Sequence, residues 1–205
     1  VETVEEWAFG CCTNVTDLTI GTGLKTVGEF GFGGFLKIEK LHISDLAKWS
    51  VVNFEGLEDG GLDALYSLPL AGTWVKVYGD NSESSTEVEI HQIYKGLSTA
   101  LYLNGTLVED LEIPDTVTTI GAGVFSCITS LKSIVIPNSV TSIGSAAFAG
   151  AINVTSIDIG SGVTVMGKGA FAYCWEAQTL NYNANITTDY ERSSWVFNSL
   201  GMDSD

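Results

Sequence analysis

The chain has 205 residues, enough for one sizeable domain or two small ones. Apolar residues make up 45% of it, a composition that favours a packed core over global disorder. Against 25 acidic residues stand only 9 basic ones, which gives a formal charge of −16. Such a surface repels phosphate groups, so the composition argues against nucleic-acid binding and against attachment to anionic membranes.

No segment of the sequence is apolar enough to cross a bilayer. The longest uncharged stretch, residues 133–157, contains Pro137, Asn138 and Asn153. It is therefore unlike the run of about 20 apolar residues that a transmembrane helix needs. The sequence starts without methionine and without the basic and apolar regions of a secretory signal. We expect no membrane insertion, and a chain that was excerpted or processed from a longer protein.

The first 45 residues already show a repeat. Residues 1–23 and 24–45 share a template in which two apolar positions three apart precede a small residue followed by Phe. The template returns over residues 117–139, 140–162 and 163–185, so five copies share a period of about 23 residues. Its phenylalanine holds one phase throughout: Phe9, Phe32, Phe125, Phe148 and Phe171. A period of this length is typical of a solenoid, in which neighbouring repeats bury one another's apolar faces.

Each copy continues into an apolar segment with the spacing LxxLxL. Apolar residues that alternate with polar ones predict a short half-buried strand, and one strand per repeat predicts a parallel sheet along one side of the solenoid. The Phe and Gly positions are expected to form the opposite wall, with Phe stacked on Phe along the interior. The apolar positions of the five copies are Val15/Leu18/Ile20, Ile38/Leu41/Ile43, Leu131/Ile134/Ile136, Val154/Ile157/Ile159 and Ala177/Leu180/Tyr182, and a sixth such segment, Val108/Leu111/Ile113, lies in the less regular middle region. The side chains expected to point outward are Asp17/Thr19, Lys40/His42, Asp110/Glu112, Ser133/Val135, Ser156/Asp158 and Thr179/Asn181.

The period is lost between Trp49 and Leu97. Apolar runs on both sides of the polar tract 80–84 predict a β-hairpin that extends from the solenoid. Insertions in repeat proteins often lie on the binding face, although a loop without a ligand fits the pattern equally well. We expect one continuous solenoid domain in four parts: repeats over 1–45, an irregular repeat with the hairpin over 46–100, repeats over 101–185 and an incomplete repeat over 186–205.

The sequences DLEIPDTVTTIGAGVF (110–125) and LKSIVIPNSVTSIGSAAF (131–148) carry a family resemblance. They resemble the BspA-type leucine-rich repeat, and the resemblance covers residues 1–45 and 97–200. Residues 101–114, in which Asn104-Gly105 predicts a tight hairpin, and the LAKW sequence at 46–49 resemble the irregular unit of that family. The resemblance implies a leucine-rich repeat solenoid in a surface or secreted protein that binds host or matrix proteins.

The sequence shows no set of residues typical of catalysis. The glycine-rich stretches 21–28 and 31–34 lack the Gly-Lys-Ser/Thr ending of a phosphate-binding loop, and the nucleophile-elbow sequence GxSxG is absent. We therefore expect no catalytic site, no cofactor and no enzymatic activity.

The four cysteines are predicted to be free thiols. None of them forms the closely spaced set of soft ligands that a zinc site needs. Cys12, Cys127 and Cys174 fall just after the Phe position of their repeats, where a free thiol packs as a small apolar residue. The alternatives are a vicinal Cys11–Cys12 bridge and an intermolecular bridge.

Two acidic tracts offer oxygen ligands to a cation. Residues 80–84 match the DxSxS pattern of integrin-type metal sites, and a second cluster follows the start of the insert: Glu55, Glu58, Asp59 and Asp63. Acidic runs on a surface are usually solvated, so we expect no metal site. Calcium binding by the second cluster is the open alternative.

The outward positions of the predicted sheet hold no Trp, Tyr or Arg, the residues that usually anchor a partner. Aromatic side chains gather instead in the insert and towards the end of the sequence, and we expect these two regions, rather than the sheet, to anchor a tightly bound protein. The aromatic residues are Trp74, Tyr78, Tyr94, Tyr190, Trp195 and Phe197. The alternative is that they fill local cores. If the protein is secreted by a eukaryote, four asparagines in Asn-X-Ser/Thr sequences are candidates for N-glycosylation: Asn14, Asn104, Asn153 and Asn185.

Two functions fit these observations. The first is a non-enzymatic adhesion or interaction module, extracellular or at the cell surface, that binds a protein or glycan ligand. The second is a structural subunit whose copies stack end to end into an extracellular filament or sheath, because the first and last repeats lack the polar caps of a finished solenoid.

Overall fold

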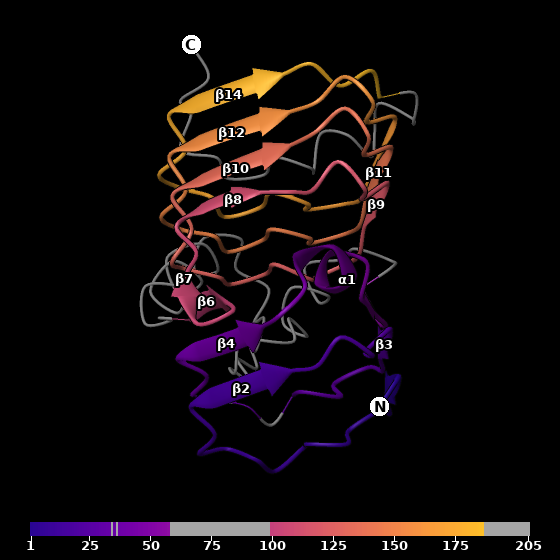
Figure 1. Ribbon diagram of the computed structural model, residues 1–205, viewed down its shortest axis with the longest axis vertical. Helices are drawn as coiled ribbons and strands as arrows, with labels where there is room; N and C mark the ends of the chain where they lie inside the picture. The colour runs from indigo at the N-terminus through magenta and orange to yellow at the C-terminus, as the bar shows by residue number, and fades with distance from the viewer. Residues whose placement is uncertain (34, 36, 58–98, 187–205) are drawn as a thin grey trace, which may run out of the picture.

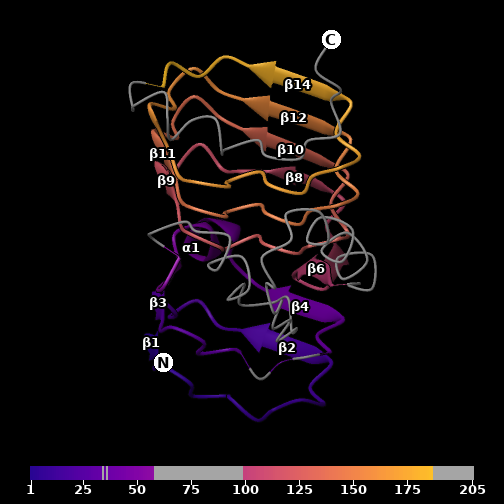
Figure 2. The same ribbon diagram turned by 180° about the vertical axis from the view of Figure 1, so that it is seen from behind.

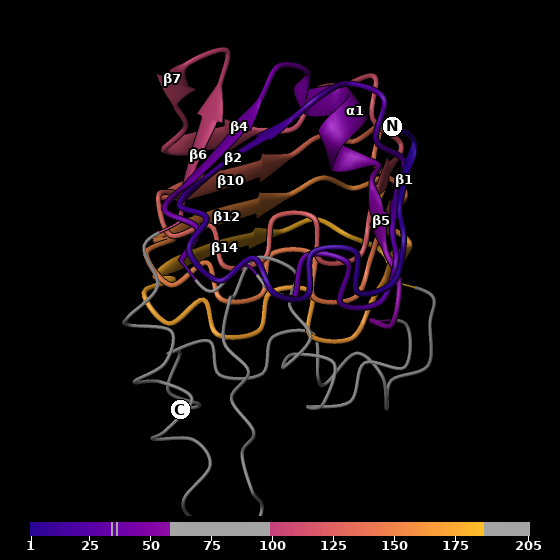
Figure 3. The same ribbon diagram turned by 90° about the horizontal axis from the view of Figure 1, so that it is seen from below.

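The computed structural model describes residues 1–33, 35, 37–57 and 99–186. Within these ranges the chain winds into coils stacked along one axis, as the repeat period predicts (Figure 1, and from behind in Figure 2). Seen from below, the longer strands form one wall of the coil and shorter strands form another (Figure 3). The solenoid fold is thus confirmed.

The longer strands form two sheets on one wall. The first has the strand order β2-β4-β6-β7 and the second the order β14-β12-β10-β8. All neighbours are parallel except β6 and β7. In the second sheet, Ser133 pairs with Asp110 on one side and with Ser156 on the other, each 23 residues away. The bounds are β2 (Asp17–Ile20), β4 (Lys40–Ile43), β6 (Ala100–Leu103), β7 (Thr106–Leu107), β8 (Asp110–Glu112), β10 (Ser133–Ile136), β12 (Ser156–Ile159) and β14 (Thr179–Tyr182).

The alternation of apolar and polar residues sets which side chains these strands bury. In β10, Ile134 and Ile136 are buried, whereas Val135 between them is 40% exposed. Each side chain that the pattern places outward is exposed or half-buried, which confirms that part of the prediction.

A second, shorter strand occurs in most coils and was not predicted. Two-residue strands form the sheets β1-β3-β5 and β13-β11-β9. The repeat glycine that follows β3, β9, β11 and β13 lets adjacent coils approach closely, since a Cβ atom on Gly144 would lie 2.4 Å from the backbone nitrogen of Ala122. The bounds are β1 (Thr3–Val4), β3 (Thr26–Val27), β5 (Asn53–Phe54), β9 (Thr119–Ile120), β11 (Ser142–Ile143) and β13 (Val165–Met166).

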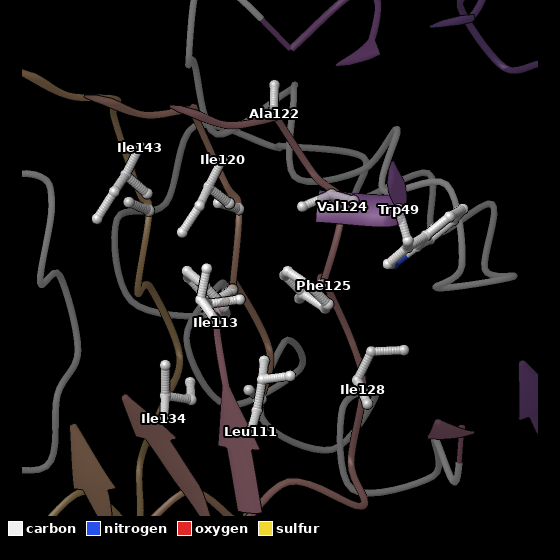
Figure 4. Packing of buried hydrophobic residues seen from close by; sticks show 14 of the residues in the cluster. Trp49, Leu111, Ile113, Ile120, Ala122, Val124, Phe125, Ile128, Ile134 and Ile143 are labelled. Carbon is white, nitrogen blue, oxygen red and sulfur yellow. The ribbon is translucent and has the colours of Figure 1, made fainter. Parts of the chain in front are cut away.

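The repeat phenylalanines stack through the core. The rings of Phe125 and Phe148 lie 5.3 Å apart, those of Phe148 and Phe171 lie 5.0 Å apart, and both pairs are within 7° of parallel. Aliphatic side chains such as Ile113 and Ile128 surround Phe125 (Figure 4). Phe9 continues the row, with its ring centroid 5.8 Å from that of Phe32, but it is not buried as the repeat position predicts. Its ring is 39% exposed because, among the described residues, its coil has a neighbour on one side only.

A one-turn helix, α1 (Leu46–Ser50), follows β4. Asp45 caps it by accepting a hydrogen bond from the backbone N–H of Lys48 at 3.0 Å. Trp49 is buried in the cluster that contains Val124 and Phe125 (Figure 4). The backbone N–H of Gly121 donates to the carbonyl of Ser50 at 2.8 Å, so the end of the helix joins the coils before and after the insert.

The predicted Asn-Gly hairpin is present between β6 and β7. Asn104 and Gly105 have φ angles of 51° and 81°, as a tight two-residue turn requires. The hairpin ends the first sheet, and β8 starts the second. At this junction, Ser130 Oγ accepts from the backbone N–H of Leu101 at 3.1 Å and donates to the carbonyl of Val108 at 2.8 Å. The Ser130 hydroxyl therefore links the two sheets at the point where the regular main-chain hydrogen bonds between neighbouring strands are interrupted.

We expect Ser130→Ala to lower the free energy of unfolding by about 1–3 kcal/mol, because it removes the hydrogen-bond partner of a backbone N–H that is shielded from water. Ser133→Ala is the matched control. It removes a hydroxyl bound to Asp110 on the exposed face and should change stability by no more than about 0.5 kcal/mol. Urea denaturation measures both. Equal losses in the two variants would contradict this role of Ser130.

Candidate functional site

The six aromatic residues predicted to anchor a partner lie outside the described residues: Trp74, Tyr78, Tyr94, Tyr190, Trp195 and Phe197. The same holds for the tract 80–84 and for Glu58, Asp59 and Asp63. Glu55 is described and is exposed. These assignments remain predictions, and the outward face of the two long-strand sheets is the candidate surface that the described residues offer.

On the first sheet, an electrostatic cluster surrounds Asp17. Its carboxylate accepts a hydrogen bond from the Thr16 hydroxyl at 2.9 Å and lies 3.2 Å from the ammonium of Lys40. These two partners hold the pKa of Asp17 below its ordinary value. The Nε2 atom of His42 lies 3.8 Å from the same carboxylate. The negative charge of Asp17 is therefore neutralised within the sheet.

His42 also contacts Tyr102, a residue that the sequence prediction left off this face. Their ring centroids are 4.9 Å apart with an interplanar angle of 24°. Strand pairing sets His42 opposite Tyr102, and Tyr102 opposite Leu107, which is 43% exposed. The alternation in Ala100–Leu103 is the signal that could have identified Tyr102, because Leu101 is buried and its neighbour must point the other way.

The second sheet presents a different face. Val135 is flanked in register by Glu112 on β8 and Asp158 on β12. The Asn181 amide donates to Asp158 at 3.5 Å, and the Ser133 hydroxyl donates to Asp110 at 2.6 Å. The carboxylate of Glu109 pairs with Lys132 and raises the pKa of that lysine. This face thus combines carboxylates, hydroxyls and one exposed aliphatic side chain.

The four candidate glycosylation sites differ in their surroundings. Asn104 is exposed at the tip of the hairpin. The Oδ1 atom of Asn14 accepts from Lys37 at 3.1 Å. The Nδ2 atom of Asn153, which would carry a glycan, donates instead to the carbonyl of Thr129 at 2.8 Å. Asn185 is exposed, and its backbone N–H donates to the carbonyl of Val163. Glycosylation of any of them remains a prediction.

All four cysteines are free thiols, so the vicinal Cys11–Cys12 bridge is not formed. Cys127 and Cys174 are buried, as predicted, while Cys12 is half-buried and Cys11 is exposed. Burial raises the pKa of Cys174 to about 12. Burial, with a smaller contribution from Cys174, raises the pKa of Cys127 further.

These two thiols predict a loss of stability at alkaline pH. Below the unfolded thiol pKa of about 8.5, both the folded and the unfolded chain keep these thiols protonated, and their contribution to stability is fully present. Above that pH the unfolded chain loses the two protons while the folded chain retains them, so the free energy of unfolding falls. The loss is about 1.4 kcal/mol per thiol for each pH unit. Compared with Cys127→Ala/Cys174→Ala, the free energy of unfolding of the unaltered chain should therefore fall by about 2.5 kcal/mol more between pH 9 and 10. Urea unfolding of both proteins at each pH measures the difference. An equal fall in the free energy of unfolding of the two proteins would contradict the prediction.

A cavity of about 10 Å³ lies beside α1, between Thr22, Asp45 and Trp49, with room for about one water molecule. In the described parts of the chain, no group of three or more His, Cys, Asp or Glu side chains is placed to hold a metal ion. No helix there is long and apolar enough to span a membrane.

The repeat coils have a family signature. The BspA type leucine rich repeat region matches residues 1–56 and 95–199, in six copies. The chain belongs to the BspA-type leucine-rich repeat family. The match covers the coils on both sides of the insert and leaves the centre of the insert unmatched, in keeping with the loss of period there.

Two crystal structures are similar to this BspA-type chain. A leucine rich cell surface protein from Faecalibacterium prausnitzii A2-165 is 20% identical, with a TM-score of 0.43, over 92% of this chain and 45% of that one. A leucine-rich repeat protein from Eubacterium ventriosum is 16% identical, with a TM-score of 0.44, over 90% of this chain and 58% of that one. The chain thus spans about half the length of these proteins. No curated protein matches the sequence.

Proposed function

We propose that the protein is a non-enzymatic interaction module, extracellular or at the cell surface, that binds a protein partner through the outward face of its long-strand sheets. Membership of the BspA-type repeat family supports this class of function. The observation that carries the proposal is the second sheet, whose outward side chains stand in register from β8 to β14. A regular row of exposed side chains on rigid strands is a preorganised binding surface.

Two exposed valines provide a matched test of this surface. Val135 on β10 is 40% exposed, and Val165 on β13 is 43% exposed in the sheet of short strands. The full chain is assayed for binding to an array of matrix proteins and glycans. Val135→Arg should then abolish binding of any protein that is captured, and Val165→Arg should leave it intact. Equal effects of the two substitutions would reject the outward face as the site.

Self-association is the second candidate function, and one observation favours it. Phe9 is 39% exposed, whereas Phe32, at the same position of the next coil, is 2% exposed. Stacking of a further coil from a second copy would bury the Phe9 ring as the other repeats bury theirs. Sedimentation across a concentration series tests this function. Growth into large oligomers that Phe9→Ser prevents would support it, and a constant monomer mass would reject it.

A further inference from the structure

An exposed valine between two carboxylates is the most specific feature of the second sheet. Val135 projects from the outward face of β10, while Ile134 and Ile136 on either side of it are buried. Its register neighbours are Glu112 on β8 and Asp158 on β12. Adjacent strands are about 4.8 Å apart, so the two acidic residues flank an aliphatic platform at a backbone separation of about 10 Å.

No cation in the described part of the chain pairs with either of these carboxylates. The nearby Lys132 is paired with Glu109, and Asp158 accepts only a long bond of 3.5 Å from the Asn181 amide. On the first sheet, by contrast, the ammonium of Lys40 lies 3.2 Å from the carboxylate of Asp17. The lysine beside the second sheet is thus already paired with Glu109, whereas no basic partner of Glu112 or Asp158 is found among the described residues.

The spacing also restricts which cation fits. A calcium ion holds its oxygen ligands at about 2.3–2.6 Å, whereas Glu112 and Asp158 are separated by the width of two strand spacings with Val135 between them. A basic side chain supplies the positive charge and is also long enough to lie across Val135 and reach a carboxylate. The methylene groups of arginine or lysine cover apolar surface while the charged head reaches a carboxylate.

We propose that the face formed by Glu112, Val135 and Asp158 binds an arginine- or lysine-rich extended segment of a partner protein. The inference rests on the proposed function and names the chemistry of the partner. One basic side chain lies across Val135, and its charged group pairs with Glu112 or Asp158. A second basic residue two positions further along the partner pairs with the other carboxylate. The net charge of −16 steers such a segment towards the chain.

The test uses the full chain and a synthetic peptide, Gly-Arg-Ser-Arg-Ser-Arg-Gly, with its Glu-for-Arg counterpart as the negative probe. Titration calorimetry gives the Kd, and amide chemical shifts give the site. Binding of the arginine peptide should move the amides of β8, β10 and β12. We expect Glu112→Gln/Asp158→Asn to raise its Kd at least about tenfold, since two charged contacts are lost. Val135→Ser should raise it by about threefold.

The matched control is Glu5→Gln/Glu6→Gln, which removes the same charge from exposed positions in the first coil. It should change the Kd by less than about twofold. Circular dichroism verifies that all variants are folded. Equal weakening by the control, or shifts scattered over every acidic residue, would show that only net charge attracts the peptide and would overturn the proposal.

The outcomes also separate this inference from the proposed function. If Val135→Arg abolishes capture of a matrix protein while Glu112→Gln/Asp158→Asn leaves the peptide Kd unchanged, the face binds a protein but not a basic segment. The inference then fails and the function stands. If the peptide binds as expected but no protein is captured by the surface, the site assignment stands and the function fails.

Discussion

Alanine in place of Gly144 should lower the free energy of unfolding by about 3 kcal/mol or more. The added Cβ atom would lie 2.4 Å from the backbone nitrogen of Ala122 and 2.7 Å from the carbonyl carbon of Gly121. Both atoms belong to the main chain of the adjacent coil, so no side-chain rotation relieves the overlap. The coils must separate, which also strains the 2.8 Å bond from the Gly144 N–H to the carbonyl of Ile120.

Gly21→Ala is the matched control for this substitution. A Cβ atom at that position meets nothing within 4 Å, so alanine should leave stability unchanged or raise it by up to about 1 kcal/mol through the unfolded state. Thermal and urea unfolding of both variants measure the contrast. A Gly144→Ala protein as stable as Gly21→Ala would show that the coils are not held at the observed separation.

Truncation of Phe148 to alanine should destabilise the protein by about 3–5 kcal/mol. Phe148 is the middle ring of the stack, with neighbours at 5.3 and 5.0 Å, and its side chain is completely buried. The coils on either side hold the cavity open because their backbone bonds tie them together. The loss therefore includes both the transfer of the ring and the unfilled space.

Phe9→Ala is the control, because Phe9 occupies the same repeat position with a ring that is 39% exposed. It contacts Phe32 and Phe35 at 5.8 and 5.3 Å, so its loss should cost less than about 2 kcal/mol. Chemical denaturation compares the two at one pH and temperature. If both substitutions cost the same, the phenylalanine stack is not the centre of the core.

The repeat period made the fold predictable because it fixes which residues face which. Once the 23-residue register was recognised, the buried positions of β10 and β12 and their outward neighbours followed from alternation alone. The Asn104-Gly105 turn was predictable for a local reason, since few other residue pairs accept two positive φ angles.

Other features depend on three-dimensional context. The exposure of Phe9 depends on how many coils flank it, which a repeat template does not encode. Tyr102 was missed because β6 follows the insert, where the 23-residue period is interrupted and no longer indicates which residues point outward. Helix α1 is a single turn held by a cap and by burial of Trp49, and one turn is too short to produce a periodic pattern.

The division of the long-strand wall into two sheets has a mechanical consequence. Within each sheet, a pull along the solenoid axis is opposed by ladders of main-chain bonds that must break together. Between β6 and β8 the described residues offer instead a few separate links, such as those through Ser130, Thr99 and Gly121. Under tension the coils should part first at this junction, and each block should keep its own sheet as the two separate, because only Val108 and Glu109 join β7 to β8.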